Sequence, residues 1–207
     1  RSNYVIMGIP VATALLGAGE LGTVSILIAV VVPLFNMLAV VVLEVFRGQR
    51  PKPLHVLGQI VKNPLVIASV LGILTLAAGT RLPHILEQTI QNVSAIASPL
   101  QLFLLGAFFQ FSGIRRYVRE LTAVVAAKLI VFPALFLGLG ALLGFRDAAF
   151  VSLLGVFASP TAVNSFTMAQ QMGGDAELAG DIVVVTSAVS MLTMFLWVFL
   201  FKSLGMF

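Results

Sequence analysis

Residues 157–174 read FASPTAVNSFTMAQQMGG, and they interrupt an apolar run with a proline and uncharged polar side chains. The apolar run begins near Phe150 and closes at Phe157. The polar residues that follow are Ser159, Thr161, Asn164, Ser165, Thr167, Gln170 and Gln171, with Pro160 among the first of them. No charge marks the stretch as a loop in water. It therefore predicts a membrane-spanning helix that is broken at Pro160.

The composition of the whole chain is that of a membrane protein. Of its 207 residues, 59% are hydrophobic and 10% are charged, and the mean hydropathy is +1.09. An ordinary soluble domain has about 25% charged residues. Apolar runs long enough to cross a bilayer recur along the chain, without the alternation of a β-barrel. We therefore expect one all-α, polytopic membrane domain over residues 1–207, and the absence of cysteine excludes a disulfide framework.

Turns divide the chain into a half-span and six spans. The half-span covers residues 3–16, and full spans are predicted near 22–46, 64–79, 86–112, 120–144, 148–171 and 177–203. Asn63-Pro64 is typical of a helix start, with a capping side chain before a proline. Because the half-span is too short to cross a bilayer, we expect the chain to be a fragment that begins inside a helix. A short re-entrant helix is the alternative.

Basic residues in two connections predict the orientation. Connection 47–63 carries Arg47, Arg50, Lys52 and Lys62, and connection 113–119 carries Arg115, Arg116 and Arg119. Two spans separate these loops, so both lie on one side, which is cytoplasmic by the positive-inside rule. The C-terminus is then outside. The net charge of +4 is explained by topology and does not indicate a nucleic-acid partner.

A shift of 157 residues aligns residues 2–45 with residues 159–202 without a gap. The identities include Gly17 with Gly174, Glu20 with Glu177 and Leu21 with Leu178, and charged identities are rare in so apolar a chain. By the predicted orientation, the span at 22–46 runs inward and the span at 177–203 runs outward. The repeat is therefore predicted to be inverted, as in many secondary transporters.

The break at Pro160 is where a transporter of this architecture would bind its substrate. The half-helix that follows would present unpaired N–H groups and a partial positive charge, which suit a carboxylate. The repeat places Asn3 opposite Pro160, at the partner break. The predicted substrate site therefore consists of Asn3, Ser159, Pro160, Thr161, Asn164 and Ser165. The alternative is a proline kink whose polar groups bond to neighbouring helices.

Several stretches of the sequence, in their order along the chain, closely resemble the auxin efflux carrier family. The stretch Asn3-Tyr-Val-Ile-Met-Gly-Ile-Pro10 resembles the family's crossover motif. The others are Lys62-Asn63-Pro64, LPHILEQTIQNVS at 82–94, PLQLFLLGAF at 99–108 and SPTAVNSFTMAQQMGGD at 159–175. The family includes plant auxin exporters and bacterial dicarboxylate carriers, and the chain resembles the bacterial type. Plant members have a proline before the first crossover asparagine, where this chain has Ser2.

The resemblance implies ten helices in two inverted five-helix repeats, with the fourth and ninth helices crossing at their breaks. On that mapping the chain lacks about the first three and a half helices. Residues 1–46 would end the first repeat, 47–63 would form a cytoplasmic loop and 64–207 would form the second repeat. The resemblance also implies a scaffold domain that often forms homodimers, a moving transport domain, and elevator-like export of organic anions.

Other polar residues lie within the predicted spans. Lys128 is deep in an apolar helix, where an unpaired cation costs about 3 kcal/mol. It is a candidate to balance the charge of an anionic substrate, or to hold a carboxylate or a helix C-terminus. Gln101 is expected to bond to neighbouring helices or to line the site, and Asp181 is a candidate for proton exchange. Three acidic residues that follow glycine turns are expected to cap helices: Glu20, Asp175 and Glu177.

These features predict a secondary transporter that exports small organic anions by alternating access, in the inner or plasma membrane and surrounded by the lipid bilayer. An intramembrane enzyme is not favoured, because GGD at 173–175 has no second embedded aspartate beside it. No cofactor or metal site is expected. Two alternatives stay open. One is a sodium-coupled symporter of the bile-acid type, which the lack of a carboxylate at the crossovers disfavours; the other is a membrane sensor or assembly module.

Overall fold

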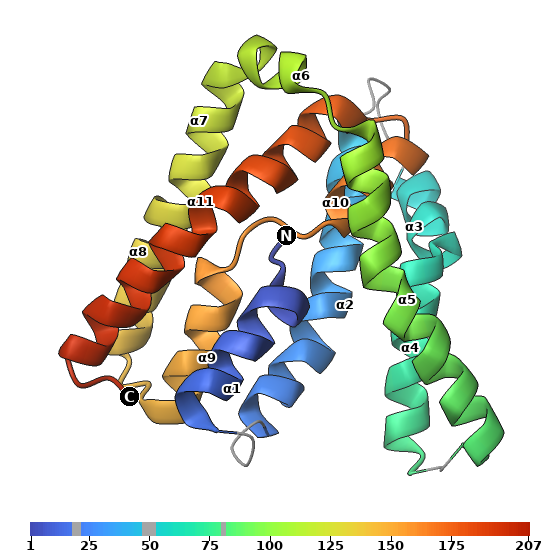
Figure 1. Ribbon diagram of the computed structural model, residues 1–207. Coiled ribbons are helices and arrows are strands. Elements are labelled where there is room, and N and C mark those ends of the chain that lie inside the picture. The colour runs from blue at the N-terminus through green and yellow to red at the C-terminus, as the bar shows by residue number, and fades with distance from the viewer. Residues whose placement is uncertain (18–21, 47–52, 80–81) are drawn as a thin grey trace.

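The computed structural model describes residues 1–17, 22–46, 53–79 and 82–207. These residues form helices joined by short connections and include no strand, which confirms the all-α class (Figure 1). Among them, four helices are long and apolar enough to cross a membrane: Gly22–Val45, His84–Phe108, Val118–Leu142 and Ala176–Ser203. The length and composition of these helices confirm a polytopic membrane protein.

The N-terminal residues form the expected half-span. A π-helical turn, η1, covers Tyr4–Gly8 and continues into α1, Ile9–Leu16. Pro10 has no backbone N–H to donate to the preceding turn, and it lies just after the π-helical turn passes into α1. The second helix, α2, covers Gly22–Val45. Glu20, predicted as a cap of this helix, lies outside the described residues.

Connection 47–63 is not the plain loop that the sequence predicts. Residues Pro53–Lys62 form α3, and α4, Pro64–Ala77, follows after one residue. The segment PLHVLGQIVK has apolar residues at helical spacing, which favours a helix. Asn63 begins α4 as predicted, because its side-chain oxygen accepts a hydrogen bond from the N–H of Leu65 at 2.9 Å. The basic residues of 47–52 lie outside the described residues.

Connection 113–119 is also partly helical. The preceding helix, α5, covers His84–Phe108, and the chain is extended at Phe109 and Gln110. A short helix, α6, then covers Phe111–Arg116. Two arginines lie in its last turn, where a positive charge complements the helix dipole.

The next span contains a π-helical turn. It consists of α7, Val118–Ala126, then η3, Ala127–Val131, then α8, Phe132–Leu142. A π-turn disturbs the regular ladder of backbone hydrogen bonds and leaves a carbonyl available for another donor. Here the indole N–H of Trp197 donates to the carbonyl oxygen of Leu129 at 2.9 Å. This contact ties the span to the last helix.

The stretch around Pro160 is broken as predicted. Helix α9 covers Asp147–Ala158, α10 covers Asn164–Gln171, and the residues between them are not helical. The last helix, α11, covers Ala176–Ser203. Asp175 caps it as predicted, since its carboxylate accepts a hydrogen bond from the N–H of Leu178 at 2.9 Å. Glu177 lies in the first turn of α11, also as predicted.

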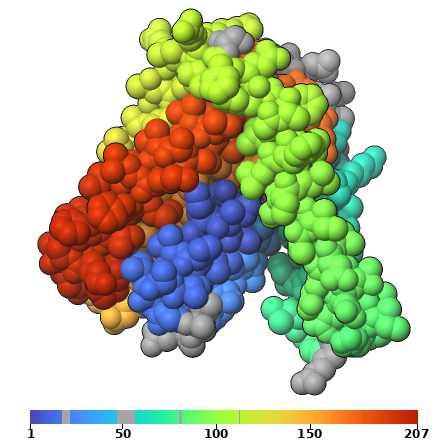
Figure 2. All heavy atoms as spheres, in the orientation of Figure 1, coloured from blue at the N-terminus to red at the C-terminus, as the bar shows by residue number. Residues whose placement is uncertain are grey.

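Helix α9 lies at the centre of the packed core. Its residues Phe150 and Leu154 pack against α8 and the end of α11, whereas Val151 packs against η1, α1 and α2. Figure 2 shows the lower ends of α4 and α5 projecting away from these helices. Many apolar side chains of α4 and α5 are exposed, as expected for helices that contact lipid or another protein surface. The core therefore places the break after α9 in the middle of the molecule.

Candidate functional site

The break after α9 meets the N-terminal residues. The backbone N–H of Asn3 donates a hydrogen bond to the carbonyl oxygen of Pro160 at 2.8 Å. The hydroxyl of Ser2 donates to the carbonyl oxygen of Val156 at 2.5 Å. In Figure 1 the N-terminus lies against the connection between α9 and α10. The N-terminal residues therefore bind carbonyl oxygens of the break and of the end of α9, which lipid could not do.

Three of the predicted site residues stabilise the break itself. The buried hydroxyl of Ser159 donates to the carbonyl oxygen of Gly155 at 2.5 Å, an oxygen that the end of α9 leaves free. Pro160 supplies the carbonyl that Asn3 binds. The backbone N–H of Thr161 donates to the hydroxyl oxygen of Thr186 on α11 at 3.2 Å. Their observed contacts hold the two half-helices and α11 together.

A cavity of about 310 Å³ lies beside this crossing, between the N-terminal residues, α2, α5 and the start of α10. We call it the crossing cavity. It brings together three predicted site residues, Asn3, Gln101 and Asn164. Arg1 and Ser98 add further polar groups to its wall. Ligand pockets typically have volumes of about 300–1,000 Å³, so the crossing cavity suits a small molecule.

The start of α10 differs from the expected row of free N–H groups. The N–H of Ser165 donates to the carbonyl oxygen of Ala162 at 2.9 Å, and the N–H of Phe166 donates to that of Val163 at 3.0 Å. A tight turn thus satisfies two donors that a helix N-terminus usually leaves free. Recognition of a ligand in the crossing cavity therefore depends on side chains more than on this helix end.

A second, mostly apolar cavity of about 460 Å³ lies between α2, α10 and α11. Ser165 lines it, and its hydroxyl oxygen has no hydrogen-bond partner among the described residues. Arg1 lines both this cavity and the crossing cavity, and its guanidinium donates to the side-chain oxygen of Asn36. Asn36 is 3% exposed, in the middle of α2. This pair was not predicted from the sequence, although the polar amide of Asn36 inside the apolar run 22–46 was a signal for it.

Lys128 contacts the end of α9. Its ammonium donates to the carbonyl oxygen of Phe157 at 3.2 Å. Phe157 lies in the last turn of α9, where carbonyls lack helical partners and the helix dipole is negative. Of the roles predicted for Lys128, this contact favours holding a helix C-terminus.

Comparison with known protein families decides the class of the molecule. A family model described as membrane transport protein matches residues 53–198, which include the break and cover more than half of the chain. The chain belongs to this family, the auxin efflux carriers. Comparison with curated proteins and with solved structures gave no significant match.

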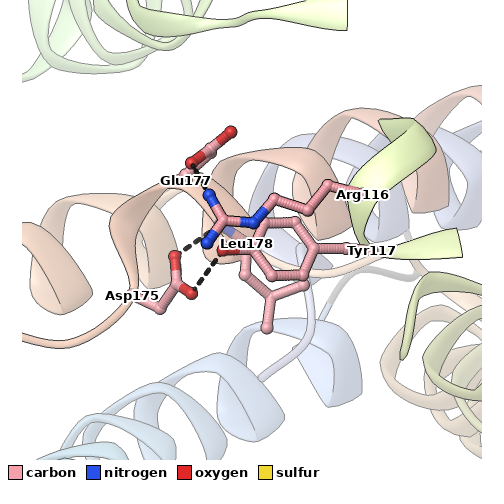
Figure 3. Close-up of polar contacts among 5 residues, drawn as sticks. All are labelled: Arg116, Tyr117, Asp175, Glu177 and Leu178. Carbon is pink, nitrogen blue, oxygen red and sulfur yellow. Dashed lines mark hydrogen bonds and ion pairs between the residues drawn. The ribbon is translucent and has the colours of Figure 1, made fainter. Parts of the chain in front are cut away.

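A further polar cluster lies where α6 and α7 meet the start of α11 (Figure 3). The hydroxyl of Tyr117 donates to the carboxylate of Asp175 at 3.0 Å. Arg116 and Glu177 form an ion pair at 3.7 Å, and the Arg116 guanidinium lies over the Tyr117 ring. Asp181, the remaining predicted site residue, lines a cavity beside this cluster and not the crossing cavity.

Tyr117 is expected to titrate at a higher pH than an ordinary tyrosine. The hydrogen bond to Asp175 raises the pKa of Tyr117 above its usual value of 10, because deprotonation would break the bond and place two negative charges together. The bond's contribution to stability is therefore present below the ordinary tyrosine pKa. It is lost as the pH rises through the raised value.

Tyrosinate absorbance can measure this shift. This sequence has two tyrosines, so a Tyr4→Phe background leaves Tyr117 as its remaining phenol. Adding Asp175→Asn should return the Tyr117 titration toward the ordinary tyrosine pKa, since asparagine carries no charge. A Tyr117 midpoint that is identical with Asp175 and with Asn at that position would contradict the prediction.

Proposed function

We propose that this chain carries the substrate site of a secondary transporter that exports small organic anions, with the anion held in the crossing cavity. The observation that carries the proposal is the position of this polar cavity. It lies where two non-helical segments meet, at the hydrogen bond between Asn3 and Pro160. Broken helices that meet in the middle of a membrane protein are a common substrate site in secondary transporters.

The side chains around the crossing cavity suit a carboxylate. Asn3, Gln101 and Asn164 can donate through their amide groups, and Arg1 adds a positive charge. A hydrogen bond to a charged group contributes about 1.5–3 kcal/mol. A few such bonds, made together, compensate for removing a small carboxylate from water. The same side chains would leave an uncharged amide less strongly bound.

The directions of the helices support alternating access between two inverted repeats. In Figure 1, α1 runs from the crossing toward one end of the molecule, whereas α10 runs from the crossing toward the other end. Helices α2 and α11, which follow them, also run in opposite directions. We further propose that connections 47–63 and 113–119 face the cytoplasm, that the C-terminus lies outside, and that a homodimer forms through the scaffold helices. The membrane would be the inner or plasma membrane.

A transport assay with matched solutes tests the proposal. The complete protein is reconstituted in liposomes loaded with labelled mono- and dicarboxylates or with the corresponding uncharged amides. We expect saturable, protein-dependent efflux of at least one carboxylate and no comparable efflux of its amide. Liposomes without protein give the background leak. Equal efflux of a carboxylate and its amide, or no carboxylate efflux above the leak, would refute an anion carrier.

A further inference from the structure

A third cavity, of about 220 Å³, lies between the end of α5, α10 and the start of α11. Asp181 lines it and is only 2% exposed. Its Oδ2 atom has no hydrogen-bond partner among the described residues. An ionised carboxylate that is buried without a partner is strongly unfavourable, so a group in this position tends to bind a proton or another cation.

The carboxylates of Glu177 and Asp181 both lie next to the Cα of Gly113 on α6. The two residues are four apart on α11, so their side chains lie on one face of the helix. The position of Gly113 shows how closely the two carboxylates approach α6. A methyl group in place of its hydrogen would lie 3.0 Å from Glu177 Oε1 and would collide with Asp181 Oδ2. Two carboxylates that converge in this way disfavour a second negative charge and favour a bound proton.

Among the described residues, the elements packed around Asp181 supply no cation that pairs with it. Helix α6 contributes Arg115 and Arg116, and Arg116 pairs with Glu177. Helix α7 contributes Arg119 and Glu120, which are exposed.

The other polar groups near Asp181 are bonded elsewhere or uncharged. Tyr117 and Asp175 bond to each other, and Lys128 of η3 bonds to the end of α9. The connection between α5 and α6 contributes Gln110, and the end of α10 contributes Gln170; both are uncharged. No described ion pair therefore includes Asp181.

The described residues favour a proton over a metal ion. They include no group of three or more His, Asp or Glu side chains that could hold a metal. A proton needs one carboxylate and an acceptor, which Asp181 and Glu177 provide. Helix α11 also connects this point to the crossing, because Thr186, five residues after Asp181, accepts the hydrogen bond from the N–H of Thr161.

We propose that Asp181, assisted by Glu177, is a proton-binding site that couples proton movement to anion transport. A proton from water binds the Asp181 carboxylate and gives a neutral carboxyl group, with Glu177 as the nearby acceptor. Movement of α11 relative to α6 would separate the two carboxylates from Gly113 and change how tightly the proton is held. The coupling rests on the proposed transport function; proton binding by Asp181 does not.

Two measurements test the site separately from transport. Infrared spectra of the complete protein, recorded as the pH is raised, detect the C=O stretch of a protonated carboxyl group. We expect wild type to show an embedded carboxyl group that Asp181→Asn lacks. Glu120→Gln makes the same chemical change at an exposed position and should keep the signal. Glu177→Gln is a second variant, expected to move the midpoint of the titration. An unchanged carboxyl signal in Asp181→Asn would overturn the assignment.

Efflux under an imposed pH gradient tests the coupling. We expect the gradient to accelerate efflux by wild type and by Glu120→Gln, whereas Asp181→Asn should transport without responding to it. A full response in Asp181→Asn would overturn the coupling, and a response to sodium at constant pH that needs Asp181 would replace the proton by a metal cation. If no variant transports any carboxylate, the proposed function and the coupling both fail, and the infrared titration still decides whether Asp181 binds a proton.

Discussion

Replacing Asn164 with alanine is expected to lower the efflux rate of the transported carboxylate about 10- to 100-fold. Asn164 begins α10 and lines the crossing cavity, where its amide can donate to a bound carboxylate. The N–H groups of Ser165 and Phe166 are already bonded to carbonyl oxygens, so they cannot readily replace that amide. Initial efflux rates from liposomes, at substrate concentrations below saturation, measure the effect.

Asn92→Ala provides the matched control for Asn164→Ala. Asn92 is exposed on α5 and does not line the crossing cavity, so the substitution removes the same atoms outside the proposed site. Its efflux rate should stay within about twofold of wild type, since exposed substitutions usually have small effects. Equal rates for Asn164→Ala and wild type would show that the crossing cavity does not bind the substrate. An equal loss in both variants would indicate a general effect on the protein.

Local sequence signals predicted the breaks and caps of this fold. Pro160 cannot donate a backbone hydrogen bond, and uncharged polar residues follow it, so the end of α9 was readable from the sequence. Asn63 and Asp175 were predicted as helix caps, because each is a short polar side chain just before an apolar run. Connections 47–63 and 113–119 were interpreted only from their basic residues. The helices α3 and α6 within them were therefore not predicted, although the apolar residues of α3 have helical spacing.

The candidate site was predicted only in part, because contacts between distant residues decide it. Asn3, Gln101 and Asn164 line one cavity, but they come from three separate segments. Ser159 has the same polar character as Asn164, yet its hydroxyl bonds to the carbonyl of Gly155. Polarity in a sequence does not distinguish a side chain that binds a ligand from one that satisfies its own backbone. The bond between Arg1 and Asn36 joins two distant segments, and the polar amide of Asn36 within its apolar run did not identify Arg1 as the partner.

Gly155→Ala is expected to destabilise the protein by about 1–3 kcal/mol, although alanine is a better helix former than glycine. Gly155 lies in α9 where η1 crosses it. An added Cβ would lie 2.6 Å from Cε2 of Tyr4 and 3.4 Å from Cα of Gly8. Tyr4 is 1% exposed, so its ring has little room to move. The methyl group would therefore push η1 away from α9 and strain the bond between Asn3 and Pro160. Thermal unfolding in detergent measures the loss.

Gly138→Ala is the matched control for this prediction. Gly138 lies within α8, and a Cβ added there would meet no atom within 4 Å. The same substitution should therefore be neutral or should stabilise the protein by up to about 1 kcal/mol, as helix propensity predicts. The two substitutions are thus expected to change the free energy of unfolding in opposite directions. This difference distinguishes close packing at the crossing from the general preference of helices for alanine. If Gly155→Ala were as stable as Gly138→Ala, η1 and α9 would not cross as closely as the structure has them, and the crossing cavity would lose the contact that fixes its shape.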